Sequence, residues 1–370
     1  MYNVIFYDDI VTRTRTTTST DEYDESSEIK YATVASGDCS TMTTAVYTFA
    51  WKYEFKNLNF DFPSLSVGYG MFKSCYNLEQ VCGTYEMIDD NGEEQIYYTS
   101  LSFDSLTNAT EMFRSCKKLK KVYIYCPSLE EAAAMFDDCV LLEIIDADFS
   151  SLKNASSMFS NTLISKVNIS SPNIIIANHM FYNCHNYKRF EGELPVLQNG
   201  ESMFELSGLG SDDEIYNWDI SLPQLENGQN MFRATSLYSF ASDLPNLKQG
   251  DRMFEASGLR KFNGSLSSLE TADSMFSGCR LDADSVFYIF DSLPVYSGEE
   301  VYTNVPLENL DSGVETYESV PNHTITIGLG CQNIFSLKEH IAKTCGCENW
   351  DALTAAFLAK GWIVSWEYNG

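Results

Sequence analysis

The sequence predicts an α/β repeat solenoid built from coils of 22–23 residues, with short parallel strands and a small α+β C-terminal cap. Three observations predict this fold: a Met-Phe pair recurs at this step, an aliphatic residue stands six positions before each Met, and Gly or Ala stands three positions before it. Such a period is typical of solenoids, in which stacked coils share one continuous core that no single coil could bury alone.

Nine Met-Phe pairs mark the coils. They are Met71-Phe72, Met112-Phe113, Met135-Phe136, Met158-Phe159, Met180-Phe181, Met203-Phe204, Met231-Phe232, Met253-Phe254 and Met275-Phe276. A tenth, degenerate unit precedes them, with Met42, Ala45 and Thr48-Phe49 at the matching positions. The recurring Gly or Ala indicates that the backbone passes too close to its neighbour for a larger side chain.

One short strand per coil follows each pair. Within residues 118–129, Val122, Ile124 and Cys126 alternate with Lys121, Tyr123 and Tyr125, which is the period of a half-buried strand. The equivalent inward positions are Leu58, Phe60, Ile145, Ala147, Val167, Ile169, Phe190, Trp218, Ile220, Phe240 and Phe262. We expect these strands to stack in parallel on one wall of the solenoid, while the Met-Phe segments close the other.

The chain divides into three predicted regions: an N-terminal arm at 1–41, the solenoid of about ten coils at 42–281, and the cap at 282–370. The 41-residue step after Met71 contains a predicted hairpin insertion at 83–100, because Asn91-Gly92 between alternating segments favours a type I′ turn. The 28-residue step after Met203 adds a shorter loop near 210–217, and insertions in solenoids often form contact surfaces.

The two ends do not repeat. In the arm, residues 2–9 are an extended segment that we expect to dock as a strand on a larger assembly, and the Thr/Ser/acid tract at 13–29 is expected to order only with a partner. In the cap, residues 285–293 and 348–361 predict helices, the second ending at Gly361, whereas 323–330 and 362–368 predict strands.

The eleven cysteines predict free structural thiols rather than a disulfide framework. The third position after the repeated Phe holds Cys, Ser or Thr interchangeably, so it requires a small, weakly polar side chain and not a covalent partner. Near the C-terminus, Cys331, Cys345 and Cys347 with His340 fall short of a four-ligand zinc set, so we expect neither a metal nor another cofactor.

The charge balance excludes several function classes. With 24 Lys and Arg against 52 Asp and Glu, the net charge of −28 disfavours nucleic acid and anionic membrane surfaces. No apolar run is long enough to span a bilayer, and the N-terminus lacks the basic start of a secretory signal, so we expect synthesis in a cytoplasm without export by that route. No nucleophile-elbow, phosphate-loop, zinc-protease or dinucleotide motif is present, so no catalytic residue is predicted.

The outward strand positions form the candidate binding face. It comprises Tyr123, Tyr125, Asp146, Asp148, Asn168, Glu191, Glu193, Asp219 and Asp243. One interpretation is a solvated strand surface, since exposed sheet faces are normally polar. The other is a hydrogen-bonding platform for a saccharide or a protein, on which Tyr123 and Tyr125 stack against the ligand.

Residues 105–122 (SLTNATEMFRSCKKLKKV) and 128–145 (SLEEAAAMFDDCVLLEII) resemble the BspA-type leucine-rich repeats and the related DUF285 repeats. The resemblance covers residues 42–281 and implies surface adhesins of bacteria or repeat proteins encoded by phages of gut bacteria, without catalytic residues. Combined with the lack of an export signal, it favours a phage virion component, in the tail or fibre, assembled in the host cytoplasm. The alternatives are a BspA-like adhesin on the bacterial cell surface and a cytoplasmic interaction module. The implied partners are other virion or surface proteins, a host glycan or a host surface protein.

Overall fold

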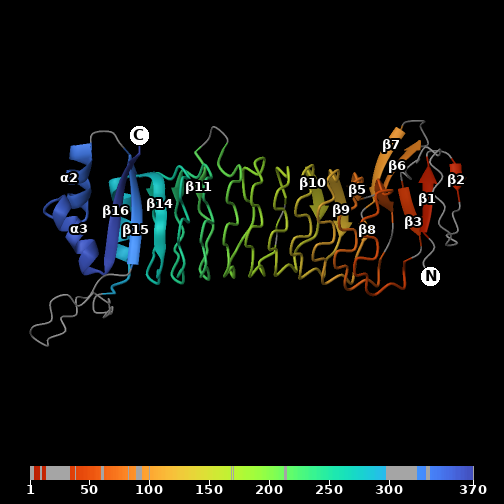
Figure 1. Ribbon diagram of the computed structural model, residues 1–370, viewed down its shortest axis with the longest axis horizontal. Coiled ribbons are helices and arrows are strands. Elements are labelled where there is room, and N and C mark those ends of the chain that lie inside the picture. The colour runs from red at the N-terminus through yellow and green to blue at the C-terminus, as the bar shows by residue number, and fades with distance from the viewer. Residues whose placement is uncertain are drawn as a thin grey trace, which may run out of the picture. The chain divides into compact units, whose positions relative to one another are not determined.

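The computed structural model describes residues 4–8, 11–13, 34–37, 39–59, 62–81, 83–88, 94–99, 101–167, 169, 171–211, 215–296, 323–330 and 334–369. The fold is a repeat solenoid of short parallel strands with a small C-terminal cap, as the sequence predicts (Figure 1). The helices that the structure describes all lie in the cap, since the described parts of the coils close with hydrogen-bonded turns.

The chain forms two compact units, residues 1–194 and 195–370. In the first unit, one sheet has the strand order β10-β9-β5-β4-β3-β1-β2, with β8 also paired to β9. Its strands are β1 (Val4–Asp8), β2 (Val11–Arg13), β3 (Val34–Gly37), β4 (Asn57–Asn59), β5 (Gln80–Val81), β8 (Leu101–Ser102), β9 (Lys121–Tyr125) and β10 (Ile144–Ala147). The pairs from β3 to β10 are parallel, as successive coils require.

In the second unit, a parallel sheet joins the strands of three successive coils, and a second parallel sheet joins the last coil to the cap. The first sheet consists of β11 (Asn217–Trp218), β12 (Ser239–Phe240) and β13 (Lys261–Phe262), and the second of β14 (Ala272–Leu281), β15 (His323–Gly330) and β16 (Trp362–Asn369). The helices of this unit are α1 (Ala283–Ser292), α2 (Ile334–Thr344) and α3 (Trp350–Ala359).

The repeated Phe side chains stack into ladders that form the centre of the core. Phe113 lies 5.4 Å from Phe72 and 5.5 Å from Phe136, measured between ring centroids, and these rings are within 6° of parallel. In the second unit, Phe232 stacks in the same way on Phe204 and Phe254. Phe49 stacks on Phe72 at 5.5 Å, which confirms that the degenerate unit is a coil.

We call the eight residues from the Gly/Ala position to the Cys/Ser/Thr position the turn wall of each coil; residues 109–116 are an example. Alternate amides of this segment donate to the next coil: Glu111 to the carbonyl of Ala133 and Phe113 to that of Met135, at 2.8 and 2.9 Å. The intervening amides close turns within the coil, as Met112 N–H does on the carbonyl of Ala109 at 3.0 Å. The turn wall therefore pairs each coil with its neighbour without forming a regular strand.

The Gly/Ala position is small for a reason that differs from our expectation. A Cβ on Gly228 would lie 3.1 Å from Met253 Sδ and 3.2 Å from Leu247 Cδ1. The corresponding Cβ on Gly68 would lie 3.2 Å from Met112 Cε. The neighbours that limit the side chain are thus the Met and Leu side chains of the next coil, not its backbone. Ala fits there as a tight contact, whereas a longer side chain would overpack the core.

The strand wall is buried less regularly than the alternation predicts. Val122 and Ile124 are buried as expected, but Ile145 and Ala147 are only half-buried. The remaining predicted inward residues that are buried are Leu58, Val167, Ile169, Phe190, Trp218, Phe240 and Phe262, whereas Ile220 is half-buried and Phe60 lies outside the described residues. After Ile145 the fully buried side chain is Phe149, so this coil turns inward later than the others.

Both inserted segments leave the stack undisturbed. The predicted insertion at 83–100 contains an antiparallel hairpin of β6 (Gly83–Ile88) and β7 (Glu94–Thr99), while Phe72 and Phe113 on either side of it still stack. The predicted Asn91-Gly92 turn lies outside the described residues. The later insertion likewise leaves Phe204 stacked on Phe232, with ring centroids 5.6 Å apart.

The N-terminal arm departs from our prediction. The segment at 2–9 was expected to dock on another molecule, but β1 pairs with β2 on one side and β3 on the other, both antiparallel. Because β3 pairs in parallel with β4, the arm continues the sheet of the solenoid. The acidic tract beyond Arg13 lies outside the described residues. One sheet therefore continues across the predicted boundary at residue 41.

The cap continues the turn wall of the last coil. β14 contains Met275 and Phe276 and pairs in parallel with β15, so the sheet β14-β15-β16 extends across the predicted boundary at residue 281. A Cβ on Gly328 would lie 2.6 Å from the carbonyl oxygen of Cys279, so only glycine allows this approach. Glu367 on β16 accepts hydrogen bonds from the Ser277 hydroxyl and the Gly278 amide.

The predicted elements of the cap are present, with one addition. Helix α1 begins after the N-cap Asp282, whose carboxylate accepts the Ser285 amide at 3.0 Å, and α3 begins after the N-cap Asn349. Helix α2 was not predicted from the sequence. Residues 297–322, between α1 and β15, lie outside the described residues. Among the residues that the structure describes, no helix has both the length and the apolar character to cross a bilayer.

Candidate functional site

The structure brings the first four residues of the candidate binding face together. Tyr123 on β9 is the register partner of Asp146 on β10. Tyr125 ends β9 with 47% of its side chain exposed, and Asp148 follows β10 closely enough for its backbone carbonyl to accept the Cys126 thiol at 3.4 Å. These residues form one contiguous outward surface over the middle coils of the first unit.

Asp148 has a local structural role within this surface. Its carboxylate Oδ1 accepts the Ser150 amide at 2.9 Å, which closes a turn, and the residue is half-buried. Asp146 is exposed on β10. Tyr125 and Asp146 are therefore the exposed members of this surface, whereas Tyr123 and Asp148 are half-buried.

The other members of the predicted face lie on later coils. Glu191 and Glu193 are exposed near the end of the first unit, and Glu191 Oε2 is paired with Lys166 Nζ at 3.2 Å. Asp219 and Asp243 are exposed in the second unit, where Asp243 accepts the Ser265 amide. Asn168 lies outside the described residues.

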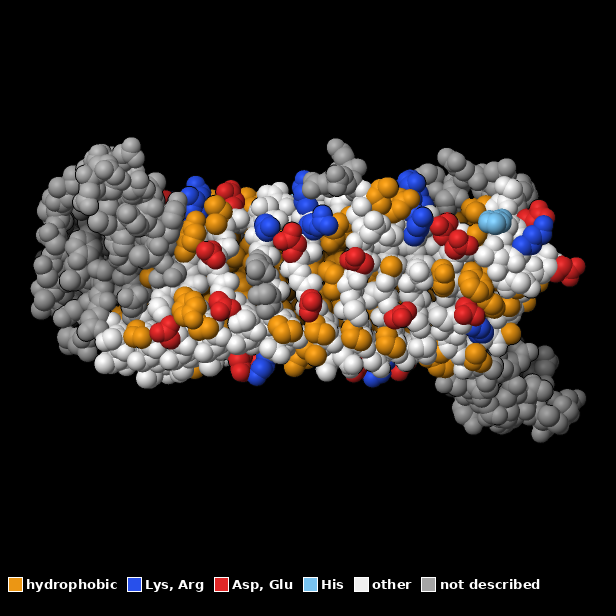
Figure 2. All heavy atoms as spheres, turned by 180° about the vertical axis from the view of Figure 1, so that it is seen from behind, with side chains coloured by type: hydrophobic (Ala, Val, Ile, Leu, Met, Phe, Trp, Pro, Cys, Tyr) orange, Lys and Arg blue, Asp and Glu red, His pale blue; other side chains and the backbone are white. Residues whose placement is uncertain are grey.

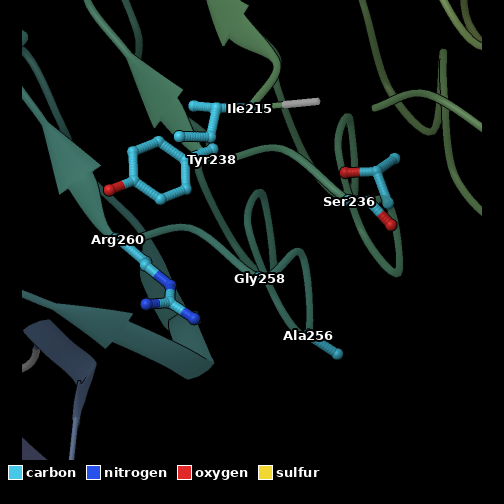
Figure 3. Close-up of a pocket in the computed structure, with 7 residues that line it drawn as sticks. Ile215, Ser236, Tyr238, Ala256, Gly258 and Arg260 are labelled. Carbon is cyan, nitrogen blue, oxygen red and sulfur yellow. The ribbon is translucent and has the colours of Figure 1, made fainter. Parts of the chain in front are cut away.

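A shallow hollow of about 330 Å³ lies in the second unit (Figure 3). It is lined by Ile215, Thr235, Ser236, Tyr238, Ala256, Gly258 and Arg260. Ile215 belongs to the five-residue insertion, and Arg260 lies over the Tyr238 ring at 5.8 Å from the guanidinium carbon to the centroid. The insertion thus forms part of a surface depression, as expected for an insertion in a solenoid, but the hollow is open and only partly polar.

The described cysteines form no disulfide, and burial lowers the reactivity of several of their thiols. Burial raises the pKa of the Cys75 and Cys279 thiols to about 12. Each thiol donates to the carbonyl of the Phe in the preceding coil: Cys75 to Phe49 at 3.2 Å and Cys279 to Phe254 at 3.1 Å. Where Thr takes the position, as at Thr162, its hydroxyl donates to a Phe carbonyl as well. At this position Cys75, Cys279 and Thr162 therefore act as hydrogen-bond donors to Phe carbonyls.

The C-terminal cysteines do not form a metal centre in the described part of the chain. Cys345 is buried and Cys347 is half-exposed, whereas Cys331 lies outside the described residues. Among described residues, no group of three or more potential metal-ligating side chains converges. Burial raises the pKa of the Cys345 thiol to about 12, which favours the protonated, non-ligating form.

The sequence analysis missed a cluster of exposed aromatic side chains on the first coils. Tyr47 and Trp51 project from the turn wall of the degenerate unit, and Tyr53 and Tyr76 occupy the same position in two consecutive coils. The signal was available in the alignment of the coils, because residues 47–53 carry three aromatic side chains at positions where later coils carry mainly small or polar ones.

The charged side chains beside this cluster are paired. Lys73 Nζ lies 2.6 Å from Glu111 Oε2, and Arg114 bonds to both Glu111 and Asp137. Burial works to raise the pKa of Glu111, but the hydrogen bonds from Lys73 and Arg114 outweigh it and hold the pKa below its ordinary value. On the face that Figure 2 draws, acidic, basic and hydrophobic side chains of the described residues are interspersed.

Comparison with models of known protein families matches six copies of the BspA type leucine rich repeat region, over residues 42–154, 107–213 and 155–282. These segments together span more than half of the chain and coincide with the coils. Neither the curated proteins nor the solved structures contain a significant match.

Proposed function

Because the chain belongs to the BspA-type leucine-rich repeat family, we propose that it is a non-enzymatic structural and binding component of a bacteriophage particle, in the tail or fibre, that contacts other proteins or the host surface. Repeat proteins of this family are binding and adhesion modules rather than typical enzymes. The observation that carries the proposal is the contiguous outward surface of Tyr123, Tyr125 and Asp146, displayed on strands that the stacked coils fix in register.

The phage assignment draws its support from the sequence. The repeat resembles those of phage-encoded proteins as well as those of surface adhesins. The family match equally favours a second candidate, a bacterial cell-surface adhesin. Both candidates use the same surface, so location separates them.

Mass spectrometry of phage particles purified from the strain that encodes the chain tests the assignment. We expect peptides of the solenoid, such as those around residues 105–160, to copurify with the particles through a density gradient. Recovery of the chain only from the cell envelope would contradict the phage assignment and support the adhesin. Recovery only from the cytosol would contradict both.

A double variant tests the binding surface itself. Tyr123→Ala with Tyr125→Ala should weaken binding of the labelled chain to host cells by about tenfold or more, because aromatic side chains dominate binding energy at protein surfaces. Tyr288→Ala is the matched control, since Tyr288 is a similarly exposed tyrosine on α1. Equal binding by all three proteins, measured by flow cytometry, would remove this surface from the proposal.

A further inference from the structure

Two positions of each turn wall adopt left-handed backbone. They are the residue before the repeated Met and the second residue after the repeated Phe, and the described coils hold both positions at φ between 50° and 72°. Their members are Gly70, Glu111, Ala134, Ser157, His179, Ser202, Asn230, Arg252 and Ser274 at the first position, and Ser74, Ser115, Asp138, Asn161, Asn183, Leu206, Ala234, Ala256 and Gly278 at the second. This backbone suits Gly and Asn best and disfavours bulky side chains.

The degenerate first coil breaks this preference at both positions. Tyr47 has φ 50° and Trp51 has φ 59°, and neither Tyr nor Trp occupies these positions in the nine following coils. A large aromatic side chain in left-handed backbone costs conformational energy that a smaller residue would avoid. Coil stacking therefore does not account for Tyr47 and Trp51, since the other coils stack without them.

The two side chains are held in place by their surroundings. The Tyr47 ring lies against Gly70, where an added Cβ would collide with Cε1 of the ring. Trp51 stacks on Tyr47 with ring centroids 5.7 Å apart and planes at 26°, and Tyr69 meets Tyr47 edge-on at 5.3 Å. The amides of Tyr47 and Trp51 each donate to the next coil at 2.9 Å. The aromatic rings are thus preorganised.

Two more rings extend the cluster. Tyr53 stacks on Tyr76 of the next coil, with centroids 5.4 Å apart and planes at 20°. We name Tyr47, Trp51, Tyr53 and Tyr76 the aromatic platform. Their exposed fractions are 36%, 52%, 47% and 38%, so each ring keeps a large part of its surface in water. Exposed aromatic surface of this kind marks an interaction site.

The polar groups beside the platform favour a neutral ligand. Lys73 Nζ lies 5.7 Å from the centroid of the Tyr47 ring and is paired with Glu111. Arg114 is neutralised by Glu111 and Asp137, so the cations bordering Tyr47 are already engaged. An anionic ligand would have to compete with these carboxylates, and the net charge of −28 would oppose its approach.

We propose that the aromatic platform binds a neutral saccharide. A sugar ring presents an apolar C–H face, which stacks on the exposed faces of Trp51 and Tyr53. Its hydroxyl edge hydrogen-bonds to polar groups such as the Tyr47 phenol, the Glu111 carboxylate and the Lys73 ammonium group. A rigid platform suits such a small polar ligand because little ordering is needed on binding. This inference rests on the proposed function, because it names the class of ligand that a host-surface contact would bind. It places that contact on the turn wall, whereas the proposed function uses the strand surface of Tyr123, Tyr125 and Asp146.

Affinity electrophoresis of the full chain tests the proposal, with mannan, laminarin and hydroxyethyl cellulose as neutral probes and polygalacturonate as the acidic probe. We expect at least one neutral polysaccharide to retard the chain. Trp51→Asn should weaken that binding by about tenfold or more. It should leave the thermal midpoint unchanged or raised, because Asn tolerates left-handed backbone better than Trp. Tyr288→Ala, which removes an exposed tyrosine from α1, should bind as the native chain does.

Four results would overturn the saccharide proposal: no retardation by any neutral probe, retardation by polygalacturonate alone, unchanged binding by Trp51→Asn, or a large fall in its thermal midpoint, which would indicate a structural role. Treatment of host cells separates this proposal from the proposed function. Loss of chain binding after periodate oxidation of surface sugars supports the saccharide. Loss after protease treatment alone leaves host contact standing and contradicts the saccharide.

Discussion

The two walls of each coil differ in regularity, and the difference shows which one holds the solenoid together. On the turn wall of residues 109–116 every amide donates a hydrogen bond, to the next coil, to its own turn or to the Asn108 side chain. On the strand wall, β9 has five residues but β5, β11, β12 and β13 have two each. Residues 162–167 of one coil belong to no strand. Register is therefore set by the turn wall, which leaves the strand wall free to vary.

The largest expected effect is on the free energy of unfolding, and it comes from comparing one substitution on each wall. Phe113→Ala should lower the free energy of unfolding by about 3–5 kcal/mol, because it leaves a cavity between Phe72 and Phe136 in the ring ladder. Ile144→Ala on β10 removes a side chain that is 41% exposed and should cost less than about 1 kcal/mol. Urea denaturation measures both. Similar losses would contradict the unequal roles of the two walls.

An intermediate effect concerns the thiols of the turn wall and depends on pH. Burial raises the pKa of Cys279 from 9.0 to about 12. Because the folded state keeps the proton longer, the contribution of this thiol is complete below pH 9 and is lost as pH rises toward about 12. Between about pH 8 and about pH 10, the free energy of unfolding of the native chain should therefore fall by about 1.4 kcal/mol more than that of Cys279→Ser.

The other thiols are identical in the two proteins and cancel from this difference, which urea denaturation at the two pH values measures. Ser is an accepted residue at this position, since Ser257 occupies it in the preceding coil, buried within the stack. Parallel alkaline losses in the native chain and the variant would show that Cys279 does not titrate as a buried thiol.

The smallest effect sharpens the description of the turn wall by comparing two alanines of one coil. Ala134 has φ 53°, whereas Ala132 lies at the Gly/Ala position and is not left-handed. Ala134→Gly should stabilise the chain by up to about 1 kcal/mol, because glycine relieves the left-handed strain. Ala132→Gly should destabilise it by a similar amount through lost packing and a more flexible unfolded chain. Thermal unfolding followed by circular dichroism measures the change in stability of each variant. Changes of the same sign in both variants would contradict this description of the turn wall.

The period of the sequence was sufficient to predict the stack. The spacing of the Met-Phe pairs placed Phe49 in a coil despite the Thr that replaces Met, because the ring ladder needs only the Phe. Both insertions were also located correctly, since interruptions of a regular period are visible without knowledge of the fold. The Cys/Ser/Thr position was predicted to be small and weakly polar, but its specific role as a donor to a Phe carbonyl depends on the distance between coils.

What the sequence could not predict depends on long-range pairing. The segment at β1 has the β-branched and aromatic residues of a strand, but nothing in its residues shows that β2 and β3 flank it on both sides. The aromatic platform was missed because the alignment of the coils shows the aromatic residues at 47–53 but not the left-handed backbone of Tyr47 and Trp51. The predicted binding face stays a prediction: pairing in register brings Tyr123 next to Asp146, but which of its members bind a ligand depends on the ligand.

Hydrogen exchange followed by mass spectrometry tests the central claim that the turn wall fixes the stack. Peptides that cover residues 109–116 should exchange at least about tenfold more slowly than peptides that cover residues 162–167, because the first segment is hydrogen-bonded at every amide and the second belongs to no strand. Equal exchange of the two segments, or faster exchange of residues 109–116, would contradict the claim.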